Sequence, residues 1–163
     1  MKTKLFSAVA ALALFAASGA AHAADATGDA AASIAVPISI AQNGAGLNFG
    51  TVTASAALGT VVVTTAGARS VTGGVAELGG TIAAATFDVT GEGTSAYTIT
   101  LPSSATLNSG GNSMTVDTFN HDAGGSPALS GGSDSFNVGA TLNVAANQAA
   151  GAYTGTYTIT VNY

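Results

Sequence analysis

The stretch YTGTYTITVNY, residues 153–163, alternates between two kinds of side chain almost without a break. Its apolar and aromatic positions are Tyr153, Tyr157, Ile159, Val161 and Tyr163, with Gly155 as the only gap. Because successive side chains of a β-strand point to opposite faces, the stretch predicts a strand with one apolar face and one hydroxyl-rich face. In an exported protein, such a strand at this end of the sequence is typical of a pilin-type subunit or of an outer-membrane barrel.

The beginning of the chain has the three parts of a secretion signal. Two lysines precede an apolar run over residues 5–17, and Ala21-His22-Ala23 matches a cleavage site. We therefore expect residues 1–23 to be a signal peptide and not a membrane helix, because the apolar run is too short to span a bilayer. The protein is expected in the periplasm during transit, and then at the cell surface or outside the cell. The remaining 163 − 23 = 140 residues suit one domain with its own core.

The mature chain carries very few charges. Arg69 is its only cation, against eight carboxylates, so its net charge is 1 − 8 = −7. Binding to nucleic acids or to anionic lipids requires cations that this chain lacks, which argues against both partners. The chain also has no cysteine, so disulfides and thiolate chemistry are excluded, and stability is expected from β-pairing and core burial.

Alternating patterns of the same kind recur through the mature chain, as in residues 34–41, 97–101 and 136–144. Glycine pairs predict turns between the strands, because glycine adopts positive φ readily. These pairs are Gly73-Gly74, Gly79-Gly80, Gly110-Gly111, Gly124-Gly125 and Gly131-Gly132, and Gly91-Glu92-Gly93 is similar. The pattern predicts eight to ten short strands in an antiparallel β-sandwich or a barrel.

The sandwich is favoured over the barrel by the shortage of aromatic residues. A membrane barrel needs aromatic girdles at both interfaces, whereas the mature chain has four Phe, four Tyr and no Trp. The expected fold is a single all-β, antiparallel, immunoglobulin-like sandwich over residues 33–163. Its core is expected to contain the inward-facing apolar residues of the predicted strands. These are Ile38, Leu47, Phe49, Phe87, Val89, Ile99, Leu142, Tyr157, Ile159 and Val161.

Four motifs occur in order along the mature chain. They are LNFG-x-V at 47–52, F-x-V-x-G at 87–91, YTITLP at 97–102, and GATLNV with the later G-x-Y-x-G-x-Y-x-I-x-V-x-Y within 139–163. Together they resemble the bacterial exported family named domain of unknown function 4402 (DUF4402). That family is similar to the spore coat U proteins and to the pilin subunits of chaperone–usher systems. Those relatives often carry a cysteine shortly after the first strand, where this chain has Gln42 and Asn43.

The resemblance implies a sandwich that lacks its last strand, so that an open hydrophobic groove accepts the N-terminal extension of a neighbouring subunit. The candidate donor strand is the extension over residues 24–32. One of its faces would carry Ala24, Ala26, Gly28, Ala30 and Ala32. The candidate C-terminal assembly strand is the apolar face of residues 153–163, with which an assembly chaperone would pair. The alternative for residues 24–32 is a disordered, alanine-rich tail with no role.

Few residues suggest catalysis, and we expect no enzyme activity, cofactor or metal. His121 with Asp117 or Asp122 could act as a base or hold a metal, but a metal site needs three or four converging ligands. A solvated loop flanked by glycine is the expected setting of His121. Gly44-Ala45-Gly46 predicts a turn, because a strand and not a helix follows it. Arg69 is expected to pair with Glu77 on the surface.

Three classes of function remain. The first is a structural subunit of a pilus or surface coat, whose partners would be other copies or related subunits, a periplasmic chaperone and an outer-membrane usher. The second is a monomeric secreted or surface domain, similar to an adhesin, that binds a carbohydrate or host molecule through its loops. The third is a small outer-membrane barrel. A length of 140 residues favours the first over the second, because tip adhesins of pilin systems usually have two domains.

Overall fold

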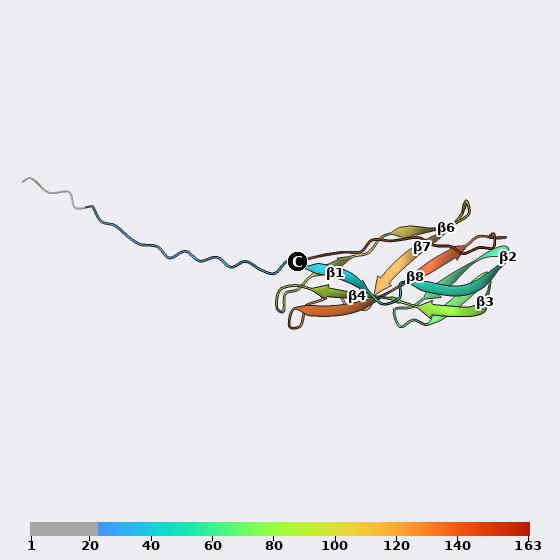
Figure 1. Cartoon of the computed structure of the whole chain (residues 1–163), viewed down its shortest axis with the longest axis horizontal. Coiled ribbons are helices and arrows are strands. Elements are labelled where there is room, and N and C mark those ends of the chain that lie inside the picture. The colour runs from blue at the N-terminus through green and yellow to red at the C-terminus, as the bar shows by residue number, and fades with distance from the viewer. Residues whose placement is uncertain (1–22) are drawn as a thin grey trace, which may run out of the picture. The chain divides into compact units, whose positions relative to one another are not determined.

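The computed structural model describes residues 23–163, so the predicted signal peptide lies outside the described residues except for Ala23. The chain divides into two units, Met1–Ser33 and Ile34–Tyr163. In the first unit, residues 23–33 are exposed and form no regular secondary structure. Among the described residues, every strand belongs to the second unit and there is no helix (Figure 1).

Nine strands follow one another in the second unit, within the expected number of eight to ten. They are β1 (Ser39–Asn43), β2 (Asn48–Val63), β3 (Arg69–Ala83), β4 (Ala85–Thr90), β5 (Thr98–Thr100), β6 (Ser104–Ser109), β7 (Asn112–His121), β8 (Ser133–Val144) and β9 (Thr160–Asn162). Every pairing between them is antiparallel. The predicted all-β, antiparallel class is therefore confirmed.

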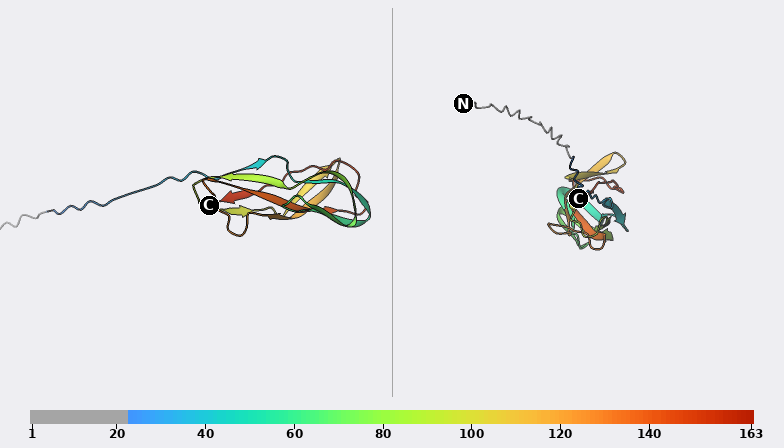
Figure 2. Two further views of the ribbon diagram at one scale, coloured as in Figure 1. Left: turned by 90° about the horizontal axis from the view of Figure 1, so that it is seen from below. Right: turned by 90° about the vertical axis from the view of Figure 1, so that its left-hand side faces the viewer.

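Strand β8 organises the larger sheet. One of its edges pairs with β4 along its first half and with β2 along its second half, and its other edge pairs with β7. Strand β1 extends the sheet beyond β4, β3 extends it beyond β2, and β6 extends it beyond β7. A smaller sheet consists of β5 and β9 (Figure 2).

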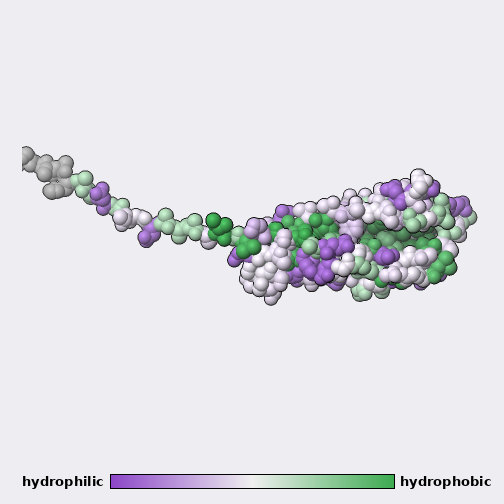
Figure 3. Space-filling model, viewed as in Figure 1, coloured by the Kyte–Doolittle hydropathy of each residue, from purple (hydrophilic) through white to green (hydrophobic). Residues whose placement is uncertain are grey.

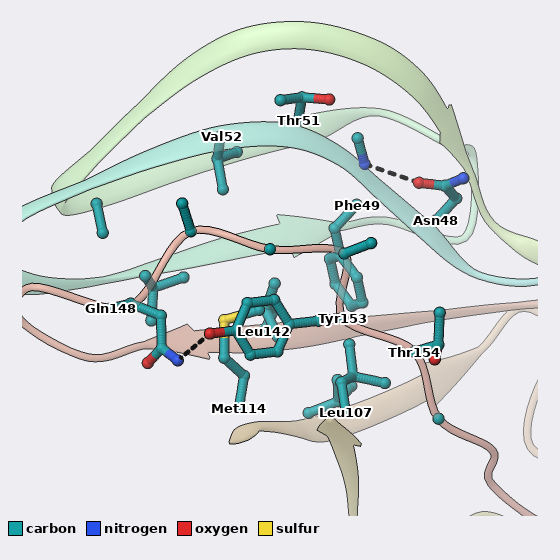
Figure 4. A pocket seen from close by; sticks show the side chains of 18 of the residues that line it. Asn48, Phe49, Thr51, Val52, Leu107, Met114, Leu142, Gln148, Tyr153 and Thr154 are labelled. Carbon is teal, nitrogen blue, oxygen red and sulfur yellow. Dashed lines mark hydrogen bonds between the residues drawn. The ribbon is translucent and has the colours of Figure 1, made fainter. Parts of the chain in front are cut away.

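Strand β2 bends sharply in its middle. Its register with β3 shifts between Ala54 and Gly59, where four residues of β2, 55–58, lie opposite the single residue Gly74 of β3. A bulge of this kind bends the strand that carries the extra residues. Consequently the second half of β2 pairs with β8, whereas residues 48–54 pair with β3 alone and curl back over the sheet (Figures 1 and 4).

Two hydrophobic clusters form the core. One surrounds Val61, Val63 and Leu142, and the other surrounds Val89, Phe136 and Val138. Four of the predicted core residues are buried: Phe49, Val89, Leu142 and Val161. The other six are half-buried. Five of them pack against one cluster or the other, and the ring of Tyr157 contacts the rings of Phe87 and Phe119 beside these clusters.

Two of the predicted turns are wrong. Gly73-Gly74 and Gly79-Gly80 lie inside β3, where the positive φ values of Gly73, Gly79 and Gly80 and the register shifts mark bulges opposite β2. Glycines with positive φ occur in bulges as well as in turns, so a glycine pair in the sequence does not show which of the two structures forms. Gly110-Gly111 is a true turn, because both glycines have positive φ and join β6 to β7 in a hairpin.

The predicted alternation is confirmed from Tyr153 to Val161 but not at Tyr163, which is exposed, and most of the stretch lacks a ladder. Tyr153, Tyr157 and Ile159 are half-buried and Val161 is buried, while the threonines between them are exposed. Only β9 forms a regular pair, and Thr154 forms an isolated bridge with Asn108 of β6. Strand β9 pairs with β5, and Thr154 pairs with β6. Because β5 and β6 are consecutive in the sequence, one side of the C-terminal segment lies along one continuous part of the chain, residues 98–109.

Candidate functional site: an apolar groove between two unpaired edges

An elongated groove of about 910 Å³ opens between the first half of β2 and residues 148–157. Its floor consists of side chains from β6, β7 and β8, and Figure 4 shows several of them pointing into the space. The floor residues are Ala105, Leu107, Met114, Val116, Leu142 and Val144. In the space-filling view the hollow is lined mainly by hydrophobic residues (Figure 3). An apolar floor open to solvent indicates a binding surface.

The first wall of the groove is a strand edge. All eight consecutive residues 47–54 line the groove, which means that the backbone itself, and not one face of the strand, borders the space. Residues 48–54 pair with β3 on one side, and the strand ladder gives them no partner on the other. The first wall therefore offers a strand edge without a partner strand above an apolar floor, although Gly50 N–H donates to Asn48 Oδ1 and the carbonyls of Phe49 and Thr51 accept from a side chain.

The second wall has the same character. Residues 148–155 also line the groove without interruption, and Tyr157 follows at its end. Among these groove-lining residues only Gln148 and Thr154 make backbone–backbone hydrogen bonds within the described part of the chain, with Ala145 and Asn108 respectively. At one end of the groove the two walls are tied together, because the N–H of Asn147 donates to the carbonyl of Ser55 at 2.7 Å. From that tie the walls run in opposite directions along the chain.

A small network holds the second wall in place. Gln148 Nε2 donates to the hydroxyl of Tyr153 at 2.7 Å and to the carbonyl of Ser113 at 3.2 Å, and the Tyr153 hydroxyl donates to the carbonyl of Ala149 at 2.7 Å (Figure 4). The Tyr157 hydroxyl is buried and has no hydrogen-bond partner among the described residues. Burial raises the pKa of Tyr157 to about 12, since the charged phenolate is disfavoured away from water.

Arg69 braces the first wall from behind. Its Nη1 donates to the carbonyls of Phe49 and Gly79, both at 3.1 Å, and to that of Thr51 at 3.4 Å. Its pairing with Glu77 is confirmed at 3.2 Å, but the expected surface position is wrong, because the Arg69 side chain is only 4% exposed. The brace encloses a bulge at Gly50, whose positive φ and close neighbours leave no room for a Cβ.

The predicted site residues separate into three places. Tyr153 and Tyr157 line the groove, whereas Ile159 and Val161 belong to the second hydrophobic cluster. Tyr163 is half exposed, and its hydroxyl donates to the carbonyl of Val36 at 2.8 Å, away from the groove. The candidate donor residues Ala24, Ala26, Gly28, Ala30 and Ala32 are all exposed. Sequence reasoning missed the first wall and the floor, although LNFG was singled out as a motif.

His121 does not lie in a solvated loop, which corrects the expectation. It is the last residue of β7, its ring packs edge-on against Phe136 at 5.9 Å, and its Nδ1 is buried without a partner among the described residues. Asp122 instead accepts hydrogen bonds from Asn137, and Asp117 accepts one from Asn143. Within residues 23–163 no three His, Asp or Glu side chains gather as a metal site would require.

Comparison with known proteins identifies the family. The chain matches the family described as domain of unknown function (DUF4402) over residues 38–163, and it belongs to that family. No curated protein and no solved structure matches the chain. The described residues also include no helix with the length and apolar character needed to cross a bilayer. Both groove walls lie inside the matched region.

Proposed function

We propose that this DUF4402 protein is a non-enzymatic, exported structural subunit of a pilus or surface coat, assembled by β-strand exchange. Its domain is then an immunoglobulin-like sandwich with one strand position left open. The observation that carries the proposal is the groove, where the free edge of β2 and the largely unpaired segment 148–157 flank an apolar floor. A strand entering there would gain main-chain hydrogen bonds from the walls and bury alternate side chains on the floor.

The walls favour a peptide strand over a small apolar ligand. A lipid or carbohydrate could cover the floor but could not pair with the backbone of residues 48–54 and 149–157 along their length. Unpaired edges of this kind invite further strands and are usually protected in soluble proteins. The edges and the floor therefore support one occupant, an extended segment with alternating apolar residues.

The N-terminal extension provides such a segment. Its candidate donor face, which begins at Ala24 and ends at Ala32, continues in register to Ile34, and Ile34 is 99% exposed. Burying an isoleucine side chain contributes about 1.5–3 kcal/mol, much more than an alanine methyl does. Ile34 is thus the expected main anchor, with the small residues before it allowing a close approach. During export, a periplasmic chaperone would pair with the C-terminal segment and an outer-membrane usher would receive the subunit.

The test compares a groove-filling variant with a matched control. Ala54 lines the groove, whereas Ala76 lies exposed on β3 outside it. Ala54→Phe should place a ring in the path of the incoming strand, and Ala76→Phe should not. The mature wild type and Ala76→Phe are expected to form an SDS-resistant ladder after expression with their native assembly partners. Ala54→Phe, checked for native circular dichroism and melting, should remain monomeric.

Two results would reject strand exchange. One is a ladder formed by folded Ala54→Phe as efficiently as by wild type. The other is a wild type that stays monomeric under assembly conditions, which would favour the alternative of a secreted or surface binding domain similar to an adhesin.

A further inference from the structure

The last residue of strand β1 begins the only Asn-Gly pair in the chain, Asn43-Gly44. Both residues are exposed. The ladder between the neighbouring strands β1 and β4 (Figure 1) ends where Asn43 pairs with Thr86, so Gly44 lies just outside it. Gly44 has a φ of +74°, and a Cβ added there would meet nothing within 4 Å. The peptide bond between Asn43 and Gly44 is therefore open to solvent and is held by the ladder on one side only.

This setting suits the reaction of an asparagine side chain with the peptide nitrogen that follows it. The Gly44 nitrogen gives its proton to the solvent and attacks the Asn43 Cγ. A C–N bond forms, the Cγ–Nδ2 bond breaks, and Nδ2 takes a solvent proton and leaves as ammonia, which closes a succinimide ring. Water then opens the ring at either carbonyl and leaves an aspartate or an isoaspartate at position 43. Glycine favours the attack, because it has no Cβ to crowd the nitrogen.

The side chain that would react also anchors the end of β1. Asn43 Nδ2 donates to Asp88 Oδ2 of β4 at 2.8 Å, and at the start of β1 the hydroxyls of Ser39 and Thr90 share a hydrogen bond of 2.7 Å. Among the strands of the described residues, β1 pairs with β4 alone. The two side-chain bonds therefore supplement a single ladder, and Asn43 supplies the one at its end.

Deamidation would turn this anchor into a repulsion. A carboxylate in place of the Asn43 amide has no proton to donate to Asp88, and it carries a negative charge at neutral pH. Like charges that face each other on neighbouring strands destabilise the pairing of those strands. Isoaspartate also lengthens the main chain by a methylene group at the residue that pairs with Thr86. Both products therefore weaken the same end of β1.

We propose that Asn43 is a site of spontaneous deamidation through the nitrogen of Gly44, and that its conversion releases the end of β1 from β4 as the molecule ages. The reaction consumes only water. It does not involve the groove, so it is independent of strand exchange. The release stays local, because β4 keeps its pairing with β8, and Ile38 and Ile40 still pack against the second hydrophobic cluster.

The conversion is measured on the mature chain, incubated at mildly alkaline pH in water labelled with heavy oxygen and then digested at acidic pH for mass spectrometry. Asn112 is the internal reference, because it is also exposed at the end of a strand but is followed by serine. Asn43 should gain a labelled carboxylate about tenfold faster than Asn112. Gly44→Ala, checked for native circular dichroism, should slow the conversion of Asn43 severalfold. Equal rates at Asn43 and Asn112, or undiminished conversion in Gly44→Ala, would overturn the site.

The release of β1 is measured by amide hydrogen exchange on variants that fix the charge at position 43. In Asn43→Asp, the hydrogen-bonded amides of β1 should exchange about three- to tenfold faster than in wild type, with no change where β4 pairs with β8. Adding Asp88→Asn restores a donor beside the carboxylate and should return the rates towards those of wild type. Unchanged exchange in Asn43→Asp would overturn the release of β1. Equal acceleration in the single and double variants would overturn the role given to Asp88.

Discussion

Arg69 is expected to stabilise the groove wall far more than its single ion pair would suggest. The change to examine is Arg69→Met, which keeps a long apolar stem but removes the guanidinium. That group donates to two carbonyls at 3.1 Å, those of Phe49 and Gly79, in a setting where its side chain is 4% exposed. After the substitution both carbonyls lose a charged donor at a bulge that no other strand covers.

The magnitude follows from those two bonds. A hydrogen bond to a charged group contributes about 1.5–3 kcal/mol, so the pair contributes about 3–6 kcal/mol before any offset. The cost of taking the guanidinium out of water offsets part of this, which leaves an expected loss of about 2–4 kcal/mol for Arg69→Met. A domain of this size has about 5–15 kcal/mol in total, so the loss should be large and easily measured.

Urea unfolding monitored by circular dichroism, on the mature chain, measures the effect, and Glu77→Ala is the matched control. Glu77 is 45% exposed, so water screens its carboxylate, but its partner Arg69 is buried, so Glu77→Ala should cost about 1 kcal/mol, the upper end for an exposed pair. Arg69→Met should thus be destabilised several times more than Glu77→Ala. Equal losses in the two variants, or a loss below about 0.5 kcal/mol in Arg69→Met, would refute the view that the carbonyl contacts brace the wall.

Three further predictions concern the core and the exposed chain. Tyr157→Phe should stabilise the fold by about 1 kcal/mol near neutral pH, because it removes a buried hydroxyl with no partner among the described residues. Burial raises the pKa of Tyr157 from 10.0 to about 12, so stability that depends on its neutral form is complete below pH 10.0 and is lost as the pH rises through about 12. Alkaline unfolding of Tyr157→Phe should therefore begin at higher pH, and an unchanged onset would argue against a buried phenol. Native trypsin should leave the mature chain intact for hours, since Arg69 is its only cleavage site and is buried, and fast cutting there would show that β3 opens readily. Ile159→Asp should prevent folding by placing a carboxylate in the second cluster, whereas Thr158→Asp on the exposed face should fold normally by circular dichroism.

Local periodicity predicted the faces of the strands well. The alternation in residues 153–163 depends only on the two-residue repeat of a strand, and the structure places its apolar positions inward as far as Val161. Tyr163 departs from the pattern because the strand has reached the end of the core, where its hydroxyl bonds to Val36.

Features that depend on distant contacts were not accessible from the sequence. The burial of Arg69 results from carbonyls ten to twenty residues away in the chain, and nothing beside it in the sequence indicates them. His121 was placed in a loop because glycines follow it, but pairing with Val138 of β8 extends β7 to that residue. The groove walls were missed for a related reason. Whether the edge of a strand has a pairing partner depends on which distant segment lies beside it, and the local sequence does not show this.

Amide hydrogen exchange on the mature chain, with and without a synthetic peptide of residues 24–36, tests the central claim most directly. If the groove accepts a strand, the peptide should slow exchange in both walls, residues 48–54 and 149–157, because N–H groups there that lack a backbone partner become paired. Exchange in β4 and the first half of β8, which are already paired, should not change. Unaltered exchange in both walls at saturating peptide would contradict the account.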